Sequence, residues 1–194
     1  MKMRGIVIIF VTFLGFYTYD ELTKPEVTIL PTELVNTTSF INSPNQDSLR
    51  IYIYELINEY RRVNGLYELI ENKDVHHYTQ DWSDKMSSSL VMSHGTGDDT
   101  PLNRWYVFKD SPNGKSCGLR YCENVVATYI VNRFHNQRQL AEQIIKQWKN
   151  SPSHNKALLR NDEGYIYHSF SCSMGEDGRV YGTWLNVTEQ NDIY

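Results

Sequence analysis

Apolar residues recur at three- and four-residue steps between Leu49 and Tyr60. Because a helix turns once every 3.6 residues, this spacing predicts an amphipathic helix with one buried face. Asp47 or Ser48 is placed to cap its first turn, and Gly65 is placed to end it. The folded part of the chain is therefore expected to begin near Asp47.

A second helix is predicted from the apolar face that runs from Val75 to Met86. Asn72 or Asp74 is its expected cap, since short polar side chains accept hydrogen bonds from the first free amides of a helix. Residues 93–113 contain several Gly, Pro and Asp residues, which favour turns. This stretch is predicted to be a long loop.

A third helical pattern is expected to end near Asn150, because Pro152 disfavours helical geometry in the residue before it. A short fourth helix is expected to start at Pro152, with Ser151 as its N-cap. The apolar face of the third helix consists of Leu140, Ile144, Ile145 and Trp148.

The hydrophobic pattern changes towards the C-terminus. Residues 165–173 and 180–187 are rich in aromatic and β-branched side chains, and residues 175–178 (Gly-Glu-Asp-Gly) form the expected turn between them. These features predict a β-hairpin. Helices followed by a terminal hairpin indicate an α+β domain in which helices cover a small antiparallel sheet.

The N-terminus has the features of a targeting segment. Lys2 and Arg4 precede an unbroken apolar run that stops at Asp20. No pair of small residues suited to cleavage follows the run, so residues 1–19 are interpreted as a signal peptide or an uncleaved signal anchor. Residues 20–46 contain prolines among Thr, Asn and Ser and are expected to form an extended linker before a domain over 47–190. The protein is expected to be secreted or anchored to a membrane.

Two sequons and three cysteines bear on the compartment. Asn36 and Asn186 each begin an Asn-x-Thr sequence and are candidate glycosylation sites. In an oxidising compartment, Cys117 and Cys122 are the local pair expected to form a disulfide. Reduced thiols at all three cysteines are the alternative.

Composition and motifs exclude several classes of function. The chain carries 19 Lys and Arg against 23 Asp and Glu, without a long basic run, so no nucleic-acid partner is expected. The sequence contains no Gly-x-Ser-x-Gly, no His-Glu-x-x-His and no glycine-rich phosphate loop. Common hydrolase and nucleotide-binding families therefore lose support.

Three polar residues near helix boundaries and loops are the candidates for chemistry: His94, Glu123 and His154. Two imidazoles and a carboxylate can bind a divalent metal such as zinc and leave coordination positions open. Structural roles are the alternative, in which each side chain satisfies backbone groups of a loop or a helix end. The histidines without such a context are expected at the surface or in packing: His76, His77, His135 and His168.

Five short motifs follow one another along the chain. They are Ile-Asn-Glu-Tyr-Arg at 57–61, Ser-His at 93–94, Glu-Asn-Val at 123–125, Trp-x-x-Ser-Pro-Ser-His at 148–154 and Tyr-Gly-Thr-Trp at 181–184. This series resembles the CAP superfamily, or SCP domain, which includes cysteine-rich secretory proteins, insect venom antigen-five proteins and plant pathogenesis-related class-one proteins. The Ser-Pro-x-His version is similar to the microbial branch.

The resemblance implies a three-layer α-β-α sandwich with a central cleft, usually exported from the cell. In the animal and plant branches the cleft holds two His and two Glu, and some members bind zinc or another divalent ion there. By motif, His94 matches the first His, Glu123 the first Glu, and His154 the His of the microbial motif. The second Glu corresponds to Ser151 here, so the chain departs from the full set of four.

Three functions follow as hypotheses. The resemblance favours a non-catalytic extracellular binding or interaction module, with a lipid, a sterol or an extracellular protein as partner. The alternative is a zinc-dependent hydrolase built on His94, Glu123 and His154, although Glu123 cannot readily serve as both metal ligand and general base. A structural surface protein anchored by the N-terminal segment is the third.

Overall fold

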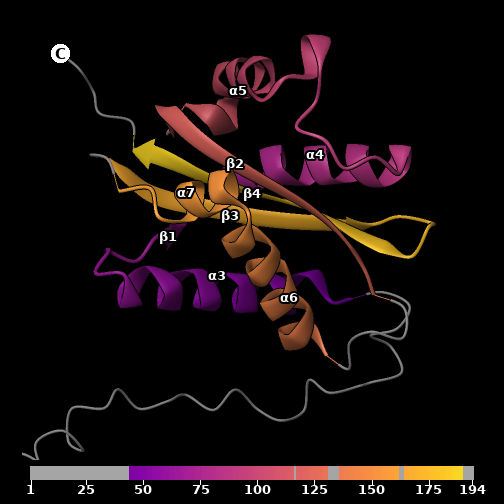
Figure 1. Ribbon diagram of the computed structural model, residues 1–194. Coiled ribbons are helices and arrows are strands. Elements are labelled where there is room, and N and C mark those ends of the chain that lie inside the picture. Colours follow the sequence, from indigo (N-terminus) through magenta and orange to yellow (C-terminus); the bar gives the residue numbers. More distant parts are fainter. Residues whose placement is uncertain (1–43, 116, 131–135, 162–163, 190–194) are drawn as a thin grey trace, which may run out of the picture. The chain divides into compact units, whose positions relative to one another are not determined.

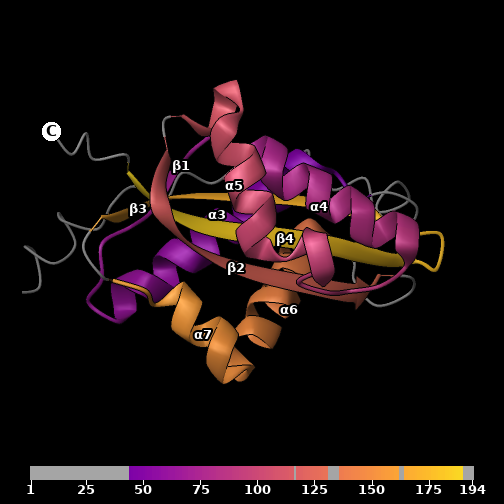
Figure 2. The same cartoon turned by 90° about the horizontal axis from the view of Figure 1, so that it is seen from above.

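Helices cover both faces of one β-sheet (Figure 1). The helices α3 (Gln46–Val63) and α6 (Gln137–Asn150) lie on one face, and α4 (His76–Ser89) and α5 (Pro101–Asp110) lie on the other (Figure 2). This arrangement confirms the three-layer α-β-α sandwich. The computed structural model describes residues 44–115, 117–130, 136–161 and 164–189.

The sheet has the strand order β1-β3-β4-β2. The terminal hairpin of β3 (Tyr165–Met174) and β4 (Arg179–Glu189) confirms the expected one, and β4 also pairs antiparallel with β2 (Cys117–Tyr129). The short strand β1 (Ile70–Glu71) pairs parallel with β3. The sheet is therefore mixed rather than wholly antiparallel, because the chain returns from α3 to the sheet edge before it enters α4.

The alternation of side chains along β4 divides the core in two. Trp184 packs with Trp148 and Phe170 in the cluster beneath α3 and α6. Its neighbour Leu185 points the other way and packs with Trp105 beneath α4 and α5. Trp148 is buried, as its place on the predicted apolar face requires, and Trp82 and Trp184 are buried as well.

Hydroxyl groups join α4 to the sheet. Thr79 Oγ1 lies 2.7 Å from Ser171 Oγ, and Ser83 Oγ lies 3.0 Å from Thr183 Oγ1. All four side chains are buried, so these bonds satisfy groups that would otherwise cost free energy on leaving water. His76 Nδ1 extends the network, 3.0 Å from Ser171 Oγ. We call the four hydroxyl-bearing residues Thr79, Ser83, Ser171 and Thr183 the hydroxyl layer.

The helix caps differ in part from those expected. Asn45, not Asp47 or Ser48, caps α3, and its side chain accepts from the amide of Ser48 at 2.9 Å. At the start of α4 the N-cap is Val75, without a side-chain bond. The expected cap residues there form a turn of their own instead, because the Asn72 side chain accepts from the Asp74 amide at 2.9 Å.

The fourth helix, α7 (Pro152–Leu158), begins at Pro152 as expected. The predicted long loop over residues 93–113 is wrong, because it contains α5 and two short 3-10 helices. Thr100 caps α5 and Pro101 occupies its first turn. At this position proline starts a helix, whereas the sequence pattern assigned it to a turn-rich loop.

The predicted disulfide between Cys117 and Cys122 is absent. Both residues lie in β2, where their partners on β4 are Glu189 and Asn186, three residues apart. Three residues of strand span about 10 Å, beyond the roughly 7 Å that a disulfide allows between Cα atoms, and an odd spacing places the side chains on opposite faces. The third cysteine, Cys172, is buried, which raises the pKa of its thiol to about 12.

The sequon at Asn186 is not a usable glycosylation site in this fold. Its side chain is fully buried in β4, whereas a glycan needs an asparagine that reaches solvent. Asn36, the segment 1–19 and residues 20–43 of the predicted linker lie outside the described residues. None of the helices in the described ranges combines the length and the apolar character that crossing a membrane needs.

A buried histidine makes stability depend on pH. His168 accepts a hydrogen bond from Trp184 Nε1 at 3.3 Å and stacks against Tyr54, with ring centroids 4.2 Å apart. Burial, and then the charge of nearby Arg61, lowers the pKa of His168 to about 3. The folded state therefore keeps this imidazole neutral, while the unfolded chain protonates it near pH 6.5.

Because only the unfolded state gains the proton, the free energy of unfolding falls as the pH drops from about 6.5 towards 3, by up to about 1.4 kcal/mol per unit. The substitution His168→Gln keeps an acceptor for Trp184 but does not titrate. Urea unfolding at pH 7 and pH 5 should show the wild type losing about 2 kcal/mol more than this variant. Equal losses in the two proteins would contradict the assignment.

Candidate functional site

Glu123 stands at the centre of the candidate site. It belongs to β2 and faces α4 and α5, with a side chain only 2% exposed. Its Oε1 lies 2.9 Å from His94 Nδ1, while its Oε2 accepts from Tyr78 OH at 2.9 Å and from Arg104 Nη2 at 2.5 Å. Both carboxylate oxygens are therefore engaged by other side chains.

Arg104, on α5, neutralises the buried carboxylate. Its guanidinium carbon lies 3.5 Å from the centroid of the Trp82 ring, a cation–π contact. Its Nη1 donates to the backbone oxygen of His94 at 2.8 Å and to that of Asp99. Arg104 therefore holds Glu123 and the backbone of the His94 loop in one network.

His94 lies in the loop after α4, and the backbone of its neighbour Ser93 is held by a side chain of that helix. Trp82 Nε1 donates to the backbone oxygen of Ser93 at 2.9 Å, which sets the direction of the loop. The His94 side chain is 44% exposed. With Glu123 accepting from Nδ1–H, the lone pair of Nε2 is left for a ligand, as in carboxylate–histidine–metal arrangements.

His154, on α7, lies beside His94. The two ring centroids are 5.9 Å apart, and Asn124 Nδ2 on β2 donates to the backbone oxygen of His154 at 3.1 Å. Burial, followed by the charge of His94, lowers the pKa of His154. A lowered pKa keeps the imidazole neutral near pH 7, which is the form that binds metal ions.

The structure thus brings the three predicted site residues together, with Glu123 supporting His94 and His94 facing His154. Two partners were missed in the sequence. Tyr78 was assigned only to a helix face, and Arg104 fell in the stretch interpreted as loop. The start of α5 at Thr100 and Pro101 was the signal that would have placed Arg104 on a helix. Burial and Glu123 raise the pKa of Tyr78, which keeps its hydroxyl a donor.

The donors fit a divalent cation only in part. No group of three or more His, Cys, Asp or Glu side chains is arranged to hold a metal ion in the part of the chain that the structure describes. Ser151, at the position of the second family Glu, has its hydroxyl 3.3 Å from that of Ser153. Of the three predicted residues, His94 and His154 keep the chemistry of zinc donors, because both oxygens of Glu123 are already bonded.

Comparisons with known proteins agree with this fold. The family model of the cysteine-rich secretory protein family, CAP, matches residues 54–185. An outer surface protein from Borrelia burgdorferi is similar in structure at 18% identity and a TM-score of 0.56, over 71% of this chain and 90% of that chain. An extracellular SCP-domain protein from Bacillus anthracis gives 20% identity, a TM-score of 0.51 and coverage of 74% and 41%.

A cysteine-rich secretory protein from Staphylococcus aureus is also similar, at 19% identity and a TM-score of 0.50, over 75% of this chain and 40% of that chain. The chain thus spans about two fifths of the length of the staphylococcal and Bacillus structures. A search of curated protein sequences gave no match. The family match covers most of the described residues and coincides with the α-β-α fold, and the chain therefore belongs to the cysteine-rich secretory protein (CAP) family.

Proposed function

We propose that this protein is a non-catalytic CAP-domain binding module that works outside the cell and takes a divalent cation of the zinc type at His94 and His154. The state of Glu123 carries the proposal. A general base needs a free lone pair facing a water molecule, whereas both oxygens of Glu123 are bonded and the side chain is 2% exposed. The carboxylate orients His94 instead.

The same observation argues against the zinc-hydrolase alternative. That reaction needs a carboxylate or a free imidazole to take a proton from bound water. Glu123 is paired with Arg104, and both histidines are used as ligands in this proposal. A bound cation would supply positive charge at this site, and an oxygen of a lipid, a sterol or a protein partner would be its ligand.

An extracellular location has two supports. Residues 1–19 have the basic and apolar pattern of a secretory signal or signal anchor. The similar structures include proteins described as an outer surface protein and an extracellular protein. These likenesses are of fold, and the location of this chain stays part of the proposal.

Metal content tests the site. The full chain, purified without chelator or nickel resin and titrated with zinc, should hold close to one ion per molecule by elemental mass spectrometry. The double variant His94→Ala/His154→Ala should lose this ion, because it removes both fitting donors. His77→Ala, at an exposed histidine on α4, should keep it.

Circular dichroism should show that the double variant is folded, since His94 is well exposed and its backbone bonds do not need the ring. His94→Gln provides a milder variant that should weaken zinc uptake alone. Absence of zinc after titration, or zinc retained by the double variant, would overturn the cation site and leave a module whose polar residues only hold loops.

A further inference from the structure

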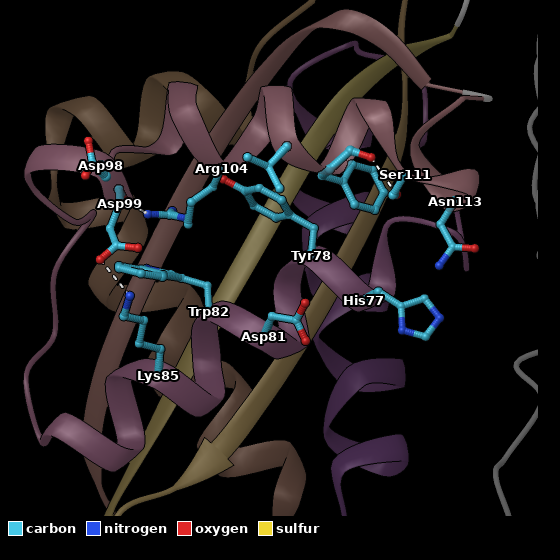
Figure 3. Close-up of a pocket in the computed structure, with 12 residues that line it drawn as sticks. His77, Tyr78, Asp81, Trp82, Lys85, Asp98, Asp99, Arg104, Ser111 and Asn113 are labelled. Atoms are coloured by element: carbon cyan, nitrogen blue, oxygen red, sulfur yellow. Dashed lines mark hydrogen bonds and ion pairs between the residues drawn. The ribbon is translucent and has the colours of Figure 1, made fainter.

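A cavity of about 520 Å³ lies between α4 and α5, next to the candidate site (Figure 3). Its α4 wall carries Tyr78, Asp81 and Trp82, which lie on one side of the helix because they are three and four residues apart. Its α5 wall carries Val107 and Phe108. The cavity does not include His94, Glu123 or His154, so it is a distinct place for a ligand.

The lysine and the arginine that line this cavity are already neutralised. Lys85 Nζ lies 2.6 Å from Asp99 Oδ2, at the end of the cavity opposite Asn113 in Figure 3. Arg104 is paired with Glu123 outside the cavity. Two further lining carboxylates, Asp81 and Asp98, have no hydrogen-bond or ion-pair partner among the described residues. The lining therefore has a surplus of negative charge.

The α5 wall formed by Val107 and Phe108 is apolar, and part of it is exposed. Val107 is 74% exposed, and Phe108 beside it packs edge-on against Tyr78, with ring centroids 5.8 Å apart. Asn113 adds an amide oxygen as a neutral acceptor. A ligand with a flat apolar body would cover Val107 and Phe108, and an ammonium group on it would meet Asp81.

From this combination we infer that the cavity binds small amines with an aromatic or other apolar body. The ammonium group pairs with the Asp81 carboxylate, and the body packs on Val107 and Phe108. Neutral molecules of the same shape bind more weakly because they lose that pair, and anionic ones because Asp81 and Asp98 repel them.

Three indole compounds of the same shape test the site: tryptamine, tryptophol and indole-3-acetate, which differ in bearing an ammonium, a hydroxyl and a carboxylate. Calorimetric titration of the full chain should show saturable binding of tryptamine, with the other two at least about tenfold weaker, as loss of a charge-assisted bond implies. The substitution Asp81→Asn should weaken tryptamine about tenfold. Asp110→Asn makes the same charge change on α5 outside the cavity and should leave binding unchanged.

Asp81 is exposed, so its variant is expected to fold, and the zinc content of Asp81→Asn serves as a check that the neighbouring site is intact. Absence of tryptamine binding, equal binding of the three compounds, or equal effects of Asp81→Asn and Asp110→Asn would each overturn the proposal. None of these outcomes depends on zinc uptake, so the experiment tests the amine site independently of the cation site.

Discussion

Replacing Arg104 with methionine should lower the free energy of unfolding by about 3–5 kcal/mol, the usual cost of leaving a buried charge without its partner. Glu123 is 2% exposed and would lose the guanidinium that now lies 2.5 Å from its Oε2. The cation–π contact with Trp82 and the bond to the backbone of His94 would disappear as well. Urea unfolding measures the loss.

A double-mutant cycle separates the charge from the packing. In Arg104→Met/Glu123→Gln the uncompensated carboxylate is gone, so the combined cost should be clearly smaller than the sum of the two single costs. Arg138→Met is the control, because Arg138 is 51% exposed and its pair with Glu142 is a surface pair worth less than about 1 kcal/mol. Equal effects of Arg104→Met and Arg138→Met would show that the pair with Glu123 contributes little.

The second large effect is expected at Arg61, near the end of α3. Arg61 is fully buried and donates to three backbone oxygens, those of Tyr67, Leu158 and Arg160, each at 2.8 Å. These bonds join α3 to the chain that leaves α7. In Arg61→Met the apolar stem is kept and the carbonyls lose their donor, which should cost about 3–5 kcal/mol in all.

Arg62→Met is the matched control for this prediction. Arg62 is the next residue, 62% exposed, and its pair with Glu68 at 2.7 Å lies at the surface. Loss of this pair should lower the free energy of unfolding by less than about 1 kcal/mol. The midpoint of urea unfolding should therefore change only slightly. A destabilisation at Arg61 no larger than that at Arg62 would mean that water replaces the lost donor.

Local patterns predicted the elements whose apolar residues fall at regular spacing. The apolar face from Leu49 to Tyr60 predicted the helix that the structure shows as α3. The effect of Pro152 on the residue before it predicted that α6 ends at Asn150. Among the longer elements, α5 and β2 were missed, for different reasons. In α5 the turn-forming residues around Pro101 begin a helix, and in β2 the polar and glycine-containing start at Cys117 conceals a strand that ends in Val, Ala, Thr and Tyr.

The candidate site was predictable only where a family motif marks it. His94, Glu123 and His154 were found in this way, and the structure brings them together. Arg104 has no such mark, because its bond to Glu123 joins residues 19 positions apart on different elements. Such a pair depends on how α5 packs on the sheet, and residue spacing within one segment does not predict that packing. The sequence alone therefore could not show that Glu123 is neutralised by Arg104 and orients His94.

The hydroxyl layer gives the two sides of the sheet different tolerance to evolutionary change. Beneath α3 and α6, side chains such as Phe170 fill space, and swaps between apolar residues of similar volume are usually mild. Beneath α4, Thr79 and Ser83 each form a hydrogen bond with one hydroxyl of the sheet. An apolar replacement on the helix would leave that buried hydroxyl without this bond. Sequence drift should therefore be slow under α4, and compensating changes there should come in pairs that cross from the helix to the sheet.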